Sequence, residues 1–359
     1  MIFLRAPVDR SGLDSFGPKT AAALCQHGLS CSYRTLWPKG IYSFYCSGKL
    51  PFGRTIFRRF LSGPLATWGF RSAQRGDISW ILSFCSPFRT EPIAERRLKA
   101  RGLHYIFHVM DDWFDIPNLK QGTILRCQIA DLVGVPTKNL KDRILEFIPS
   151  ARVEVFEEPT DLSRLQSPQK QAFSETPVIL WCGNPYNLDH ARMLLGILRK
   201  VHRQKPFEFR VICGQPPPRE FGMNLDLRWC RFDHQNEGSL IAGSWLGLAP
   251  MPDTGHNRCK GAYKVKTYLA AGLPVVASPV GFQKDLIAEG PGIGFLPKNS
   301  EEWASAILSL IQNRKLAEEM GHRARSYAET RFSYHAIGFH WASLLRKHFG
   351  AVLKNGSGA

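Results

Sequence analysis

The residues best suited to chemistry lie between positions 250 and 281, where a polar loop carrying cations leads into a helix-forming run. Arg258, Lys260 and Lys264 supply the charge, and the run from Lys264 to Ala271 predicts a helix. The first turn of a helix offers unpaired N–H groups and the positive end of the helix dipole. Cations beside such a turn make a binding site for a diphosphate. The alternative is an ordinary strand–helix–strand crossover whose charges face water.

Carboxylates follow two of the predicted strands. Asp111 and Asp112 stand directly after the apolar run 104–110. Ligands of open α/β sheets bind beyond the carboxyl ends of strands, so this pair is a candidate to orient or deprotonate an acceptor hydroxyl. Its alternative role is to cap the next turn. Asp253 follows the run 246–250 and is a candidate to accept hydrogen bonds from the hydroxyls of a ligand, or to be solvated in a loop.

Glycines mark turns that follow predicted strands. Gly12 lies between a strand and a helix, where it could approach phosphates or simply allow a tight turn. Gly183 begins a Gly-Asn-Pro turn with Asn184, and Gly214 ends the next strand. These residues either lie close to a bound nucleotide or simply allow the chain to turn after a strand.

The elements that must position these residues alternate between strand and helix. Strands are expected over 2–4, 30–36, 77–84, 104–110, 132–136, 178–182, 209–213, 225–229, 246–250, 275–277 and 294–296. Helical runs separate most of them, which predicts parallel sheets built from strand–helix–strand units. A polar stretch over 157–176 contains two prolines and lacks a hydrophobic period, so it reads as a linker. The fold class expected is α/β, with two facing Rossmann-like domains over 1–160 and 175–332, followed by a helix over 333–350.

Composition narrows the class of protein. The nine cysteines are scattered and form no CxxC pair, which argues for reduced thiols and against a zinc site. No apolar run approaches the roughly 20 residues that span a bilayer, so a cytoplasmic protein is expected. The net charge is +17, and residues 1–100 hold 15 Lys/Arg against 5 Asp/Glu, or +10. Arginines alternate with aromatic residues over 52–75, a mixture that suits contact with an anionic membrane surface and predicts a peripheral membrane protein. A need for solubility alone explains the positive charge equally well.

The stretch from Lys264 to Gly281, KVKTYLAAGLPVVASPVG, resembles the donor-site signature of family 4-type glycosyltransferases, also called glycosyl transferases group 1, which have the GT-B fold. A weaker similarity runs over 176–348, and the first domain resembles the family only in outline. The resemblance implies that the first domain binds the acceptor, that the second binds a nucleotide sugar, and that 333–350 is a crossover helix packing back on the first domain.

The resemblance also implies roles for individual residues. Lys264 or Arg258 would meet the diphosphate, while Thr267 and Cys259 stand where the family usually carries glutamates. The expected donor-binding set is Gly12, Gly183, Asn184, Gly214, Asp253, Arg258, Gly261, Ala262, Tyr263, Lys264 and Thr267. The expected catalytic residues are Asp111 and Asp112, and no metal ligand is expected.

The function that follows from the resemblance is transfer of a glycosyl group from a UDP- or GDP-linked sugar to an acceptor hydroxyl, with retention of configuration. The donor acts as co-substrate and no resident cofactor is expected. The acceptor could be a saccharide, a lipid-linked molecule or a small molecule. Two alternatives stay open: a catalytically inactive GT-B-like protein that binds a ligand or partner, and a nucleic-acid-binding protein. The positive net charge favours nucleic-acid binding, but the sequence contains no recognition motif for it. A nucleic-acid partner is therefore not expected.

Overall fold

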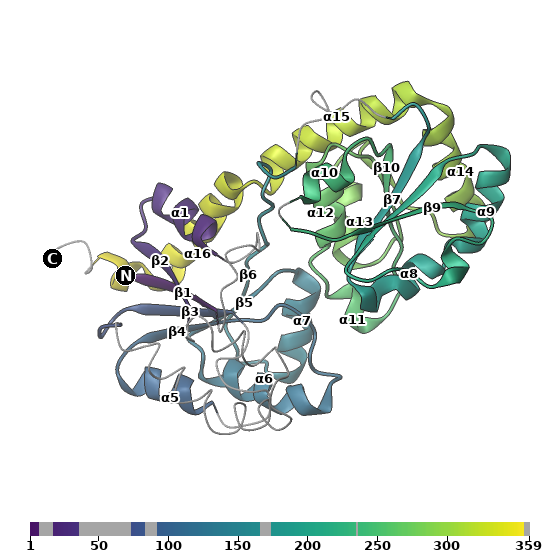
Figure 1. Ribbon diagram of the computed structural model, residues 1–359. Helices are drawn as coiled ribbons and strands as arrows, with labels where there is room; N and C mark the ends of the chain where they lie inside the picture. Colours follow the sequence, from purple (N-terminus) through teal and green to yellow (C-terminus); the bar gives the residue numbers. More distant parts are fainter. Residues whose placement is uncertain (7–16, 36–72, 83–91, 166–173, 235, 355–359) are drawn as a thin grey trace, which may run out of the picture. The chain divides into compact units, whose positions relative to one another are not determined.

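The structure, a computed structural model, describes residues 1–6, 17–35, 73–82, 92–165, 174–234 and 236–354 (Figure 1). The chain divides into two compact units. Unit 1 consists of Met1–Pro159 together with Tyr334–Ala359, and unit 2 consists of Thr160–Ser333. The chain thus leaves unit 1 once and returns to it at the end.

Unit 1 is built on a six-stranded sheet in which every pairing is parallel. Its strands are β1 (Ile2–Ala6), β2 (Cys31–Thr35), β3 (Ile78–Leu82), β4 (His104–His108), β5 (Leu132–Val135) and β6 (Val153–Val155). They lie in the order β2-β1-β3-β4-β5-β6. The central strands β3 and β5 are buried along their whole length because helices cover both faces of a parallel sheet.

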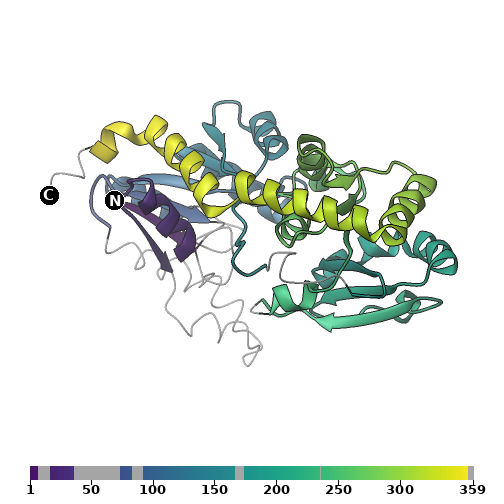
Figure 2. The ribbon, with the colours of Figure 1, turned by 90° about the horizontal axis from the view of Figure 1, so that it is seen from above.

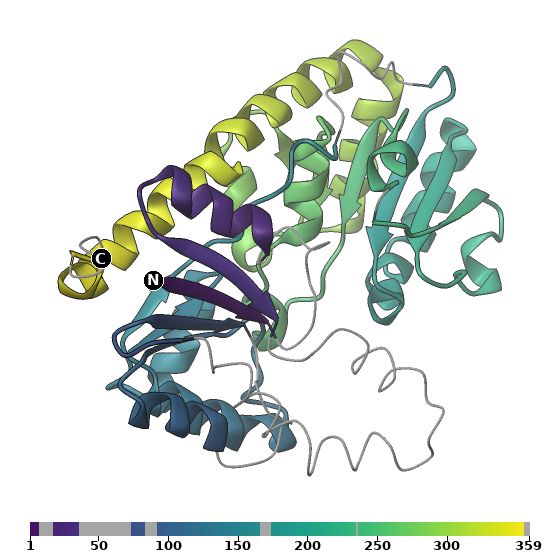
Figure 3. The same ribbon diagram turned by 60° about the vertical axis from the view of Figure 1, so that its left-hand side comes forward.

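The helices of unit 1 form two layers. They are α1 (Pro18–Gln26), α5 (Ile93–Ala100), α6 (Pro117–Ile129), α7 (Lys138–Phe147) and α16 (Tyr334–Lys354). Right-handed crossovers put α1 on one face of the sheet and α5, α6 and α7 on the other. Figures 2 and 3 show α16 lying beside α1.

The C-terminal helix α16 completes the core of unit 1. Trp341 is fully buried, and its ring centroid lies 4.8 Å from that of Trp80 on β3 and 5.6 Å from that of Phe156. Its indole N–H donates to the carbonyl of Glu157 at 3.0 Å. On the other side of the sheet, the fully buried Arg126 of α6 donates to Glu95 of α5 at 2.8 Å.

Unit 2 repeats the architecture with a second parallel sheet of six strands, ordered β12-β11-β10-β7-β8-β9. The strands are β7 (Val178–Gly183), β8 (Glu208–Cys213), β9 (Asp226–Arg231), β10 (Leu246–Ala249), β11 (Val275–Ala277) and β12 (Gly294–Phe295). The expected class, an α/β protein with two Rossmann-like sheets, is confirmed by these two sheets. None of the helices in the described ranges has both the length and the apolarity of a bilayer span.

The helices of unit 2 cover both faces of this sheet. They are η3 (Pro185–Asn187), α8 (Leu188–Arg192), α9 (Leu195–Gln204), η4 (Arg219–Phe221), α10 (Glu237–Ile241), α11 (Gly255–Arg258), α12 (Tyr263–Ala270), α13 (Gly281–Glu289), α14 (Ser300–Gln312) and α15 (Arg314–Arg331). α9 packs beside α14, and α12 packs beside α15. The sequence over 188–204 predicts one long helix, but the chain turns at Met193 and Leu194 and forms two helices instead.

The segment Thr160–Leu165 belongs to unit 2, although its composition suggested a linker over 157–176. The guanidinium of Arg325 on α15 donates to the carbonyls of Leu165 at 2.8 Å and of Leu162 at 3.4 Å. The N–H of Thr160 donates to the carbonyl of Phe332. These bonds satisfy the backbone of a segment that has no regular secondary structure.

Candidate functional site

The carboxyl ends of β7 and β8 bring three predicted residues together. Gly183 ends β7 and pairs in register with Cys213, and Gly214 follows directly. Asn184 accepts from the N–H of Tyr186 at 3.1 Å and thereby caps the short helix η3. A Cβ at Gly214 would lie 3.8 Å from the Pro185 ring. The turn chemistry expected of these positions is therefore present, and it occurs at the ligand-binding edge of the sheet.

The loop after β10 contains a short helix where the sequence suggested only a polar turn. Thr254 caps α11 by accepting from the N–H of Asn257 at 3.2 Å. The guanidinium of Arg258 donates to both carboxylate oxygens of Asp253, at 2.6 and 3.0 Å, and this bond holds the pKa of Asp253 below its usual value. Two expected donor-binding side chains thus bind each other at an exposed position.

The start of α12 has the geometry of an anion site. Ala262 stands before the helix at φ +55°, a left-handed conformation that is uncommon outside glycine. No side chain caps the helix, and its first backbone bond runs from Lys266 N–H to the carbonyl of Ala262 at 3.1 Å. Gly261 precedes this turn, and the ring of Tyr263 is exposed. The N-cap residue Ala262 therefore has no side chain that could accept from the first turn of α12, and an anion can take the place of such a cap.

Lys264 connects this helix start to the end of β7. A Cβ at Gly183 would lie only 2.9 Å from Cε of Lys264, so the glycine leaves room for the lysine stem. The ammonium lies 5.4 Å from the ring centroid of Trp181. The pKa of Lys264 is lowered to about 8, chiefly by burial, and the charge of Lys260 acts in the same direction. An anion bound here would offset the cost of that buried charge.

His190 on α8 is a member of this cluster that the sequence analysis missed. Burial lowers its pKa to about 4, and the charges of Lys264 and Lys260 act in the same direction. Its Nδ1 is buried and has no hydrogen-bond partner among the described residues. The signal available in the sequence was a histidine shortly after the turn that ends β7, hidden inside what looked like one long helix.

Thr267 lies on α12 with its side chain only 2% exposed. The next residue, Tyr268, accepts from the N–H of Cys182 at 2.7 Å and donates to the carbonyl of Leu248 at 3.3 Å, which ties α12 to two strands. Gly247 permits this packing, since a Cβ there would overlap the Tyr268 ring. The helix is thus fixed on the sheet, and the expected ribose contact of Thr267 stays a prediction.

In unit 1 the aspartate pair follows β4, as expected. Asp112 is 1% exposed, accepts from the N–H of Phe114 at 2.9 Å, and lies 3.3 Å from the guanidinium of Arg143. These contacts agree with the turn-forming alternative for Asp112, while Asp111 is partly exposed. Its catalytic role stays a prediction, as does that of Asp112. Gly12 lies outside the described residues.

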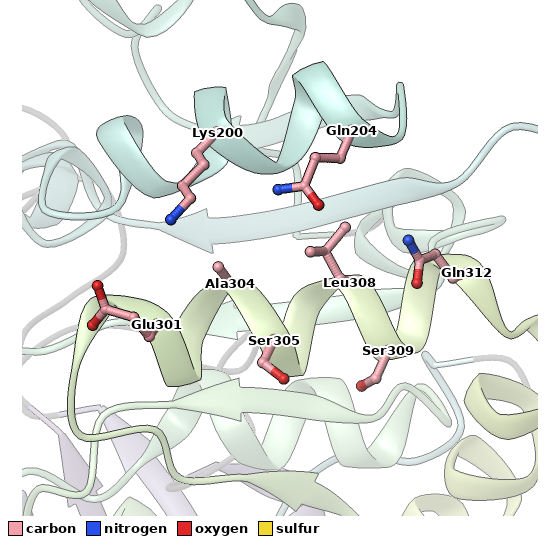
Figure 4. Close-up of a pocket in the computed structure, with 8 residues that line it drawn as sticks. All are labelled: Lys200, Gln204, Glu301, Ala304, Ser305, Leu308, Ser309 and Gln312. Carbon is pink, nitrogen blue, oxygen red and sulfur yellow. The ribbon is translucent and has the colours of Figure 1, made fainter.

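Two of the hollows among the described residues of unit 2 bear on the site. The first, of about 550 Å³, lies after β9 and is lined by Arg231, Phe232, Asp233, His234, Asn236 and Leu240. The second, of about 470 Å³, lies between α9 and α14 (Figure 4). Its lining comes from the outward parts of two helices, including Lys200, Gln204 and Glu301. Only the first belongs to the sheet edge that carries Gly183 and Gly214. In the described part of the chain, no group of three or more His, Cys, Asp or Glu residues is arranged to hold a metal ion.

Comparisons with known proteins agree with this geometry. The family described as glycosyl transferases group 1 matches residues 176–313. Sucrose-phosphate synthase from Thermosynechococcus elongatus superposes with a TM-score of 0.68 at 15% identity, covering 98% of this chain and 100% of that one. Anabaena HepE in complex with UDP and glucose gives 0.64 at 16%, covering 97% and 100%. No curated protein sequence matches the chain.

A larger protein is similar over part of its length. TarM of S. aureus, in complex with fondaparinux, alpha-GlcNAc-glycerol and UDP, gives a TM-score of 0.62 at 14% identity. The match covers 79% of this chain, which spans 58% of TarM. The resemblance noted in the sequence is confirmed at the level of the fold: the chain has the two-unit GT-B fold of these solved structures, and its segment 176–313 matches the family described as glycosyl transferases group 1.

Proposed function

We propose that the protein transfers a glycosyl group from a nucleoside-diphosphate sugar to an acceptor hydroxyl, and that unit 2 holds the donor. The observation that carries this proposal is the start of α12, where a helix without a side-chain cap begins beside Lys264 and Lys260. A pyrophosphate at this position would meet helix N–H groups, a partly desolvated ammonium and the neighbouring His190. Family membership of the same segment supports this assignment.

The chemistry proposed follows from these groups. As the glycosidic bond to the diphosphate breaks, negative charge grows on the leaving group and the sugar becomes oxocarbenium-like. Lys264 and the N–H groups of α12 would stabilise that charge. Arg258 would first have to exchange its partner Asp253, so we assign the larger role to Lys264. Retention of configuration is proposed because the resembling family is typically retaining, and no resident cofactor is proposed.

The hollow after β9 would receive the nucleoside. β9 is separated from β7 by one strand, β8, and strands of a sheet lie about 4.8 Å apart, so the hollow lies roughly 10 Å along the sheet edge. A nucleoside attached to a diphosphate at β7 can bridge that distance. HepE and TarM were both solved with UDP, which supports a uridine donor.

The acceptor would bind unit 1, with Asp111 or Asp112 orienting its hydroxyl. Its class stays open among saccharides, lipid-linked molecules and small molecules. We also propose that the protein is cytoplasmic and that it contacts an anionic membrane surface. The positive charge of residues 1–100 supports the membrane contact. The stretch 52–75 that motivates membrane contact lies outside the described residues except for its last three positions. No observation favours the nonenzymatic alternative.

The test is a thermal-shift panel of UDP, GDP and their sugars, followed by assays of nucleotide release from the sugar that stabilises the chain most. Wild-type protein is expected to be stabilised and to release nucleotide. Lys264→Ala is expected to weaken binding about tenfold or more, because one charge-assisted contact to the diphosphate is lost. Lys200→Ala, in the hollow of Figure 4, is the control and should change neither quantity. Equal stabilisation of wild type and Lys264→Ala would remove the basis of the donor site.

A further inference from the structure

Arg164 is bound to the loop that lines the hollow after β9. Its Nη1 donates to the carbonyl of His234 at 3.3 Å, to Nδ1 of the same residue at 3.0 Å, and to the carboxylate of Glu237 at 3.0 Å. Glu237 is fully buried, so this ion pair is shielded from solvent on the carboxylate side. One side chain therefore fixes both the backbone and the imidazole of His234.

The segment that carries Arg164 is itself held rigidly. Arg325 binds the carbonyl of Leu165, and the same guanidinium binds the carbonyl of Ala270 at the end of α12. On the other side, the carbonyl of Arg164 packs on Gly238, where a Cβ would lie only 2.3 Å away. Arg164 thus approaches the loop from a fixed support and contacts His234, Glu237 and Gly238.

The bond to the imidazole determines which ring nitrogen of His234 carries its proton. A guanidinium can only donate, so Nδ1 of His234 must accept, and in the neutral ring the proton resides on Nε2. The rim residue His234 is thereby kept as a donor at Nε2. Asp233 and Asn236 beside it are bound to each other at 2.7 Å, which leaves the rim with a defined polar pattern.

We propose that Arg164 is a positioning residue for recognition of the donor's base: by holding His234 as an Nε2–H donor at the rim of the hollow after β9, it selects bases that present a carbonyl oxygen. Uracil offers such an oxygen where cytosine carries an amino group. A site that donates a hydrogen bond to one of these groups rejects the other, because an N–H donor facing an amino group meets a second donor instead of an acceptor. This inference rests on the proposed function, which assigns the hollow to the nucleoside.

The experiment measures dissociation constants of UDP, CDP and inorganic pyrophosphate by calorimetry, for wild type and Arg164→Met. Wild type is expected to bind UDP about tenfold or more tightly than CDP. In Arg164→Met this ratio is expected to fall to within about threefold, because the imidazole is free to change tautomer and orientation. Pyrophosphate, which does not reach the hollow, should bind both proteins within about twofold.

The control and the second variant separate the outcomes. Arg331→Met removes a more exposed arginine–glutamate pair of unit 2, with Glu289, and should leave all three constants unchanged. His234→Ala should abolish the UDP preference with Arg164 intact, so the inference stays testable if Arg164→Met does not fold.

Loss of UDP and pyrophosphate affinity in parallel, or a UDP/CDP ratio that neither variant changes, would overturn the role of Arg164. If wild type binds pyrophosphate and UDP but does not prefer UDP over CDP, the role of Arg164 is overturned while the proposed donor site stands. Wild type that binds none of the three would overturn the proposed function too.

Discussion

Lys264 is the residue on which the donor site depends, and its environment gives it a measurable property. Burial is the largest cause that lowers the pKa of its ammonium to about 8. The unfolded chain therefore binds more protons than the folded one between pH 8 and the usual lysine value of about 10.4, and folding becomes more favourable as the pH rises through this window. A bound diphosphate acts in the opposite direction, because it stabilises the charged ammonium.

This opposition predicts a pH-dependent affinity for UDP. From pH 7.5 to 9.5 the dissociation constant should rise, by at most about tenfold per pH unit above 8, because binding requires the protonated lysine. Binding near pH 8.5 should take up a proton, which calorimetry in buffers of different ionisation enthalpy detects. Lys264→Arg keeps its charge throughout and should flatten the profile. A decline of the same steepness in Lys264→Arg would assign the titration to another group.

At this scale the sequence could indicate residue types but not their partners. The cations of the 255–264 loop were visible, yet the bidentate pairing of Arg258 with Asp253 depends on the fold of α11. His190 was overlooked because its proximity to Lys264 arises from elements more than 70 residues apart in the chain. Pairings of this kind follow from tertiary structure, which a single sequence encodes only indirectly.

The elements around the site are held in place by close backbone contacts. Gly281 opens α13 at φ +52°, and a Cβ there would lie 2.5 Å from the carbonyl oxygen of Arg258 in α11. The loop before α12 is therefore packed against the following βα turn through a position that only glycine fits without strain. This contact explains why a glycine follows Pro279 and Val280 at this position.

Gly281→Ala should consequently lower the free energy of unfolding of unit 2. We expect a loss of about 2 kcal/mol or more, since left-handed backbone strain alone costs about 1–2 kcal/mol and the overlap with Arg258 adds to it. Gly255→Ala, at the start of α11 with no atom near its Cβ, is the matched control and should be close to neutral. Urea denaturation of both variants measures the difference. Equal stability of the two proteins would show that the α11–α13 contact is not formed.

Element types were largely predictable, whereas their ends were not. Strands such as Ile78–Leu82 and Val178–Gly183 are apolar runs bounded by turn residues, and both occur as expected. The break that separates α8 from α9 has no glycine or proline to announce it. α13 was missed because its first residue is the glycine of a turn motif, which normally signals a loop.

For the whole molecule, the repeated alternation of strand and helix was enough to predict two parallel sheets. What this alternation alone could not provide is the use of two segments that stand outside it. Unit 1 needs the C-terminal helix, because Trp341 occupies its core beside Trp80. Unit 2 needs Thr160–Leu165, which bears Arg164. The resemblance implied that the C-terminal helix packs on the first domain, whereas the role of Thr160–Leu165 appears only when its contacts are known.

The central claim of this account is that the first turn of α12 binds the diphosphate of a nucleotide sugar. The most direct measurement is a crystal structure of the protein with UDP, in which the position of the pyrophosphate is observed. The account predicts phosphate oxygens within hydrogen-bond distance of the first N–H groups of α12 and of Lys264 Nζ, with the uracil in the hollow lined by His234 and Asn236. A nucleotide bound in the hollow between α9 and α14, or elsewhere away from α12, would contradict it.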